Sequence, residues 1–243
     1  MHEKIGEHLT WQLPGLGSVH SDTIVTTWLV MILAWLFFGW IARTYRAGVV
    51  SKRQTVVEGV INYIADLATS VLGKQGESFV PFFIALFIFI FLLNQFGIFP
   101  LKVLGLPLGG SPTADLNTTV PYAVMVFLMI QIVGIRKYCL GFYKHLAKPF
   151  WVLTPINVLE ELARPATLAA RLFFNIFVGE LLFIIIASIV TAKVMIGPVN
   201  LSLAVTVVPF FIQFFNFFVG TVQAFLFTLL AIVYLSLAVA EDH

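Results

Sequence analysis

Long apolar stretches separated by short polar segments run along most of the chain. A helix rises about 1.5 Å per residue and the hydrocarbon core of a membrane is about 30 Å thick, so three of these stretches fit single spans. Two more stretches hold close to forty residues each, about twice what an upright span requires, and are predicted to be steeply tilted helices. The five predicted membrane helices cover residues 24–41, 79–101, 118–135, 154–192 and 201–240.

One segment after the first span has a different pattern. Over residues 51–73, apolar residues recur at steps of three and four, and polar residues such as Glu58 and Asp66 fall between them. This spacing predicts an amphipathic helix that lies at the membrane interface. Residues 1–22 form an N-terminal tail without the pattern of a cleavable signal peptide.

These elements predict an all-α integral membrane protein with a single membrane domain over residues 1–243. A tight reversal at residues 193–200, which contain Gly197 and Pro198, makes the two long helices antiparallel. Basic residues follow the spans 24–41 and 118–135, so the positive-inside rule places those ends in the cytoplasm. The same orientation leaves the N-terminus outside and the C-terminus in the cytoplasm.

Composition supports this class and excludes several others. The 243 residues are 60% hydrophobic and 11% charged with a mean hydropathy of +0.99, against about 45–50% and 25% in soluble domains. A net charge of +2 offers no basic surface for nucleic acid. The single cysteine, the five scattered histidines and the lack of a phosphate-binding glycine motif indicate no metal, cofactor or nucleotide site.

Two ionisable residues lie deep in the first long helix. A charge at mid-membrane costs about 2.5–3.5 kcal/mol, so Arg171 and Glu180 require an explanation. They are nine residues apart, which places them on opposite sides of a helix and prevents a local ion pair. A guanidinium stays protonated at ordinary pH, so the role expected for Arg171 is electrostatic. Helical spacing puts one polar stripe through Glu160, Arg164, Thr167, Arg171 and Asn175, with Glu161 beside it.

The last long helix has its own polar face. Gln213, Asn216, Gly220 and Gln223 recur at steps of three and four on a Phe-rich surface. Amides at such positions serve either helix packing or transport, and Gly220 allows a partner helix to approach closely. Ahead of the span 118–135, Asp115 is expected to cap a helix N-terminus.

Four stretches together resemble subunit a of F-type ATP synthases of the bacterial type. They are NQFGIFP at 94–100, SPTADLNTT at 111–119, RLFFNIFVGELL at 171–182 and QAFLFTLLAIVYLSLA at 223–238. The chain departs from that family at Phe174, where the family usually has glycine. It also has Asn216 where some bacterial members carry a histidine.

The resemblance implies a stator subunit of the membrane motor, located in the bacterial plasma membrane. Ions, expected to be protons, would reach the carboxylates of a rotating c-ring through two offset half-channels, with Arg171 as the electrostatic separator. The implied partners are the c-ring proteolipids, the peripheral-stalk b subunits, membrane lipid and, indirectly, the catalytic head, where the ATP chemistry takes place. The outer half-channel is assigned Glu180, Asn216 and Gln223, and the inner one Glu160, Glu161 and Asn175.

Two other functions compete with this interpretation. A structural membrane anchor would use the same charges only to pair helices, and Arg171 and Glu180 would then be replaceable. A self-contained ion-coupled carrier would use Arg171 to bind an anionic substrate. The carrier is disfavoured because the sequence has no internal repeat and no pair of interrupted helices.

Overall fold

The computed structural model describes residues 10–13, 17–44, 52–97, 111–138, 151–191 and 202–239. Within these ranges the chain is almost entirely helical, which confirms the predicted all-α membrane protein. The helices are α1 Ser21–Thr44, α2 Lys52–Leu72, α3 Val80–Phe96, α4 Leu116–Tyr138, α5 Thr154–Thr191 and α6 Ser202–Val239, with short 3-10 helices η1 Gly73–Phe79, η2 Pro112–Ala114 and η4 Trp151–Leu153.

One small departure lies in the predicted N-terminal tail. Strands β1 Thr10–Leu13 and β2 Gly17–His20 pair in antiparallel fashion directly before α1. Each strand has four residues, which is too short for an alternating pattern to be told from a loop in the sequence.

Four segments of the described chain are long and apolar enough to cross a membrane. They are Thr23–Trp40, Gln54–Phe96, Leu116–Tyr138 and Phe210–Val239. The fifth predicted span is helix α5, which has nearly the predicted bounds but is not among the four. Its first half carries charged residues, and many side chains of its apolar second half lie outside the described part of the structure.

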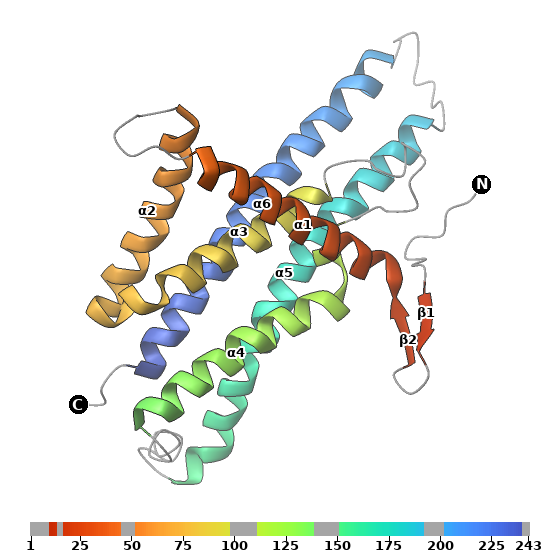
Figure 1. Ribbon diagram of the computed structural model, residues 1–243. Coiled ribbons are helices and arrows are strands. Elements are labelled where there is room, and N and C mark those ends of the chain that lie inside the picture. The colour runs from red at the N-terminus through yellow and green to blue at the C-terminus, as the bar shows by residue number, and fades with distance from the viewer. Residues whose placement is uncertain are drawn as a thin grey trace.

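Helices α2 and α3 form a hairpin (Figure 1). The turn between them is η1, whose first residue, Gly73, has a φ of 61°, a backbone conformation that glycine adopts without strain. Helix α3 ends at Phe96, earlier than the predicted end at residue 101, and residues 98–101 lie outside the described chain. The predicted interfacial position of α2 remains a prediction.

The two long helices, α5 and α6, run in opposite directions behind the other helices in the view of Figure 1. Helix α3 packs against α6, α4 packs against α5, and α1 crosses the front of the bundle at a steep angle. The core between them is filled by fully buried side chains, among them Phe83, Ile90, Leu172, Phe227 and Leu235. Helices α2 to α6 all contribute side chains to one buried cluster. This shared cluster fixes the relative positions of the two long helices.

The start of α4 is capped as the sequence predicts. The backbone N–H of Asn117 donates to Oδ1 of Asp115 at 2.9 Å, and the side chain of Asp115 is buried. Thr23 of α1 also donates to Oδ2 of Asp115 at 3.3 Å. The carboxylate therefore ties the start of α1 to the start of α4.

Candidate functional site

Arg171 lies on the exposed side of α5, among apolar side chains. Phe174 is 57% exposed and Val178 is 54% exposed, and both follow Arg171 at helical spacing on the same face. Within the described part of the chain, the side chain of Arg171 forms no hydrogen bond or ion pair. A permanently charged side chain is thus presented to the surroundings on an apolar surface.

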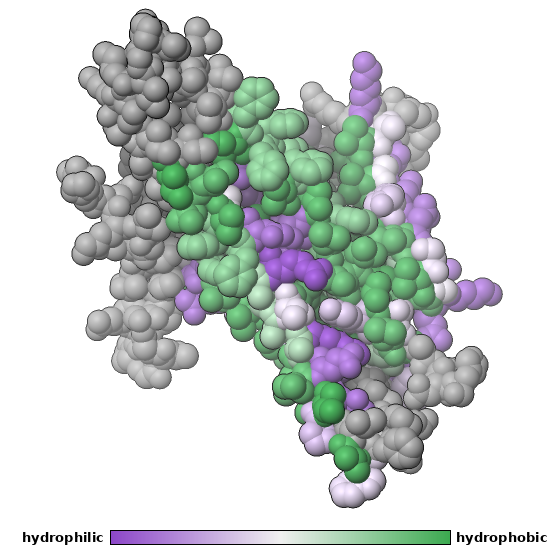
Figure 2. Space-filling view, turned by 180° about the vertical axis from the view of Figure 1, so that it is seen from behind, coloured by the Kyte–Doolittle hydropathy of each residue, from purple (hydrophilic) through white to green (hydrophobic). Residues whose placement is uncertain are grey.

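The neighbouring helix α6 also exposes apolar side chains. It exposes a run of phenylalanines that includes Phe210, Phe211, Phe214, Phe215 and Phe218. Figure 2, which views the molecule from behind, shows hydrophilic surface enclosed by hydrophobic surface. A polar centre with an apolar border suits a contact inside the membrane.

One turn beyond Arg171, α5 is joined to α6 by two amides. Asn175 donates from Nδ2 to Oε1 of Gln223 at 2.6 Å, and Gln223 is only 1% exposed. The Nε2 group of Gln223 is buried and has no hydrogen-bond partner among the described residues. The structure therefore places Gln223 with Asn175, although the resemblance assigns these residues to different half-channels.

Asn216 meets α5 at another point. Its Nδ2 lies 3.5 Å from the backbone oxygen of Gly179, the residue directly before Glu180. A Cβ added at Gly179 would lie 2.6 Å from Oδ1 of Asn216, so glycine is what allows this contact. The backbone of Glu180 belongs to α5, but its side chain lies outside the described part of the structure.

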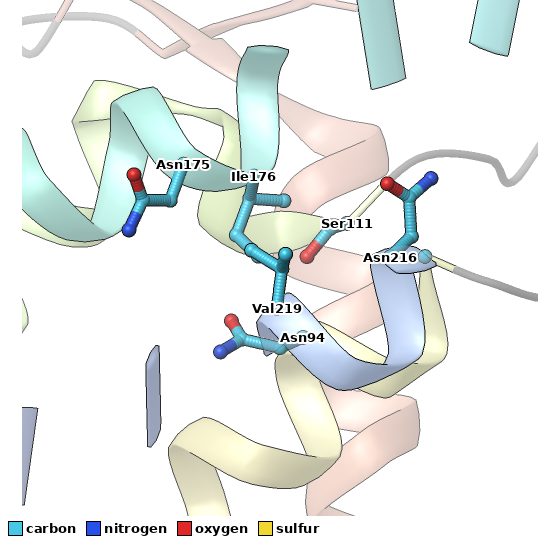
Figure 3. A pocket seen from close by; sticks show the side chains of 7 residues that line it. Asn94, Ser111, Asn175, Ile176, Asn216 and Val219 are labelled. Atoms are coloured by element: carbon cyan, nitrogen blue, oxygen red, sulfur yellow. The ribbon is translucent and has the colours of Figure 1, made fainter. Parts of the chain in front are cut away.

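A cavity of about 20 Å³ lies between α3, α5, α6 and the segment before α4 (Figure 3). That volume holds about one water molecule. In the view of Figure 3, Ile176 and Val219 lie between the side chains of Asn175 and Asn216, and all four residues line the same cavity. The polar residues that line the cavity are Asn94, Ser111, Asn175 and Asn216, all of them uncharged.

The predicted carboxylates near the start of α5 lie in different environments. Glu161 is 13% exposed, lies 3.1 Å from Nη1 of Arg164 and accepts a hydrogen bond at 3.0 Å from Nε2 of Gln131 on α4. Glu160 is 70% exposed, and its closest approach to Arg164 is 3.9 Å. Arg164 also lies over the ring of Tyr234 at 5.7 Å. Glu161, rather than Glu160, is therefore part of the packed interior.

With this geometry established, a comparison with known families identifies the chain's relatives. The family model described as ATP synthase A chain matches residues 24–236. The chain belongs to the ATP synthase A chain family. It is accordingly a multi-pass membrane protein, subunit a of the membrane sector of an ATP synthase complex, as the four sequence stretches indicate.

Sequence reasoning overlooked several neutral residues of this ATP synthase A chain. Asn94 and Gln95, at the end of α3, contact the turn of α6 that contains Gly220. Asn94 bonds to Gly220, which is 126 residues later in the sequence, and Gln95 bonds to Phe217, which is 122 residues later. Ser111 and Thr113 support Asn94 from behind. The only signals for them were the NQFGIFP and SPTADLNTT stretches, which carried the resemblance but indicated no contact.

Proposed function

We propose that this subunit provides two offset half-channels through which ions reach and leave the carboxylates of a rotating c-ring, with Arg171 as the electrostatic separator between them. The observation that carries the proposal is the exposed Arg171, unpaired within the described chain and set among Phe174 and Val178. A charge in that setting is costly unless an opposite charge meets it. The ring carboxylates would supply that charge.

The chemistry follows from the difference between two environments. A ring carboxylate that faces lipid is neutralised because desolvation disfavours its charged form. When the ring brings it to Arg171, the fixed positive charge favours ionisation, and the ion leaves. Because a guanidinium keeps its proton, Arg171 cannot pass the ion across and separates the two paths.

We assign the outer half-channel to Glu180 and Asn216, and the inner one to Glu160 and Glu161. Asn175 and Gln223, which are hydrogen bonded to each other, lie where the two paths approach Arg171. The apolar pair Ile176 and Val219 supports a division between the paths, because it lies between Asn175 and Asn216 in the view of Figure 3. Each charge that crosses the membrane releases about 2.3 kcal/mol per 100 mV, which drives the ring.

The proposal includes the setting and the partners. The c-ring would contact the exposed apolar residues of α5 and α6, peripheral-stalk b subunits would hold the subunit still, and the catalytic head would be reached indirectly. We place the complex in a bacterial plasma membrane with protons as the ion. The N-terminus is outside and the C-terminus is in the cytoplasm, because basic residues such as Arg43 and Arg136 end α1 and α4.

The test is ATP-driven ion uptake into vesicles that contain the assembled complex. Arg171→Ala is compared with Arg43→Ala, which removes an exposed arginine at the end of α1. We expect Arg171→Ala to lower uptake at least about tenfold, because an opposite charge favours carboxylate ionisation by about that factor or more. Arg43→Ala should pump normally.

Assembly of the complex is measured in the same vesicles. Loss of uptake with a fully assembled complex is the predicted result for Arg171→Ala. Undiminished uptake would contradict the proposal and favour a structural anchor. Transport by the isolated subunit, without ring or head, would favour a self-contained carrier.

A further inference from the structure

Two adjacent amides at the end of α3 hold a single turn of α6. Asn94 donates from Nδ2 to the backbone oxygen of Gly220 at 3.0 Å. Gln95 donates from Nε2 to the oxygen of Phe217 at 3.2 Å and to Oγ1 of Thr221 at 3.1 Å. Both amides are more than nine-tenths buried, so these bonds do not compete with surrounding solvent or lipid. We call Asn94 and Gln95 the amide clamp.

The clamp is supported from behind by two hydroxyls before α4. Thr113, which is fully buried, donates from Oγ1 to Oδ1 of Asn94 at 2.7 Å. The Oγ atom of Ser111 lies 2.5 Å from Oγ1 of Thr113 and donates to the backbone oxygen of Leu93 at 3.0 Å. Because the carbonyl of Gly220 only accepts, Nδ2 of Asn94 must face it, and Oδ1 must face Thr113. The carbonyl of Gly220 therefore sets the orientation of the Asn94 amide, and the hydroxyl of Thr113 stabilises that orientation by donating to Oδ1.

The clamp fits one position on α6. A Cβ added at Gly220 would lie 3.2 Å from Cβ of Asn94 and 3.3 Å from Nε2 of Gln95. A larger residue in that place would push the two helices apart. The absence of a side chain at Gly220 thus lets the amides reach the backbone of α6.

The clamped turn lies between the two amides of α6 that contact α5. Asn216 is four residues before Gly220, and Gln223 is three residues after it. A shift of one residue along a helix rotates its side chains by about 100°. Such a rotation would break the 2.6 Å hydrogen bond between Asn175 and Gln223. It would also break the 3.5 Å contact between Asn216 and the backbone oxygen of Gly179.

We propose that Asn94, whose orientation Thr113 stabilises, is a positioning residue that fixes the rotation of α6 and so holds Gln223 and Asn216 against α5. The inference rests on the proposed function, in which these two amides belong to the ion paths. Asn94 itself acts through α6 and touches no ring carboxylate.

The test changes Thr113, which lies outside α6. Thr113→Val keeps the shape of the side chain but removes the hydroxyl, and Thr113→Ser restores it. The control is Thr228→Val, because Thr228 is equally buried and its hydroxyl bonds only to Ala224 within α6. ATP-driven ion uptake is measured in vesicles and divided by the amount of assembled complex.

A second readout reports the rotation of α6. Cysteines replace Gly179 and Asn216, in a chain whose native cysteine is changed by Cys139→Ser, and oxidative cross-linking is measured in the intact complex. The contact between residues 179 and 216 makes the pair suitable, since a Cβ at 179 reaches the Asn216 side chain. The cross-link yield is then compared among three chains that carry Thr, Val or Ser at position 113.

We expect Thr113→Val to lower both uptake per complex and cross-link yield about threefold or more, because it leaves Oδ1 of Asn94 buried without a donor. Thr113→Ser and Thr228→Val should keep native uptake, and Thr113→Ser should keep the cross-link. Unchanged cross-linking and uptake with Thr113→Val, or a loss only in the amount of complex, would overturn the positioning role. Reduced cross-linking with unchanged uptake would support the clamp and contradict the proposed function of Gln223 and Asn216.

Discussion

Two arginines of α5 illustrate how strongly the surroundings decide what one residue type does. Arg164 pairs with Glu161 at 3.1 Å and lies over Tyr234, so its charge is balanced within the bundle. Arg171, two turns later, has no such partner among the described residues and lies on an apolar face. The same guanidinium therefore stabilises helix packing in one place and remains available for an external charge in the other.

The neighbouring carboxylates Glu160 and Glu161 should differ in their contribution to stability. Glu161→Ala should lower the free energy of unfolding by about 1–3 kcal/mol, because it removes the half-buried carboxylate that pairs with Arg164 and accepts from Gln131. Glu160→Ala should have little effect, since Glu160 is 70% exposed and 3.9 Å from Arg164. The measurement is the thermal dissociation midpoint of the purified complex. Equal midpoints for the two variants would contradict this distinction.

The sequence revealed charged residues more readily than neutral ones. Arg171 and Glu180 stood out because charges are rare and costly in an apolar helix. Asn94 and Thr113 did not, because an amide or hydroxyl near the end of a helix is common and its partner is far away in the sequence. The sequence also favoured Glu160 over Glu161, because helical spacing identifies a stripe but does not show which side another helix covers.

At the level of elements, Gly179 sets how closely α5 approaches Asn216 of α6. Gly179→Ala would place a methyl group 2.6 Å from Oδ1 of Asn216, which must then move. We expect a cost of about 1–3 kcal/mol in the free energy of unfolding, as for overpacked cores, and a loss of ATP-driven uptake. Uptake and thermal dissociation of the complex are the measurements.

A matched control exists in α1. A Cβ added at Gly39 would meet no atom within 4 Å, so Gly39→Ala should leave uptake unchanged and stability equal or slightly higher. If Gly179→Ala leaves uptake and stability as unchanged as Gly39→Ala does, the close contact between Asn216 and α5 is not required for function.

Helix positions were more predictable than their ends. The predicted helix 154–192 and the observed α5 nearly coincide, because a long apolar run can form little else in a membrane. The predicted span 79–101 is longer than α3, which ends at Phe96, because hydropathy alone does not mark the residue at which a helix ends. The strand pair before α1 had no sequence signal long enough to recognise.

For the whole molecule, the sequence predicted the class of protein and the structure added the packing. Hydropathy and four motifs sufficed for a membrane subunit of the ATP synthase A chain family. The contact of α3 with α6, which joins Asn94 to Gly220, was not predictable, because composition carries no information on which apolar faces meet. That contact positions α6 and, with it, Gln223 against Asn175 of α5.

The central claim is that Arg171 separates two ion paths, and passive ion flux tests it most directly. An ion gradient is imposed without ATP across vesicles that contain the assembled complex, and flux is compared for the native chain, Arg171→Ala and the control Arg43→Ala. We predict that Arg171→Ala raises the flux several-fold, because ions then pass between the half-channels without coupled rotation. Flux at the native level in a fully assembled Arg171→Ala complex would contradict the role of Arg171 as a separator.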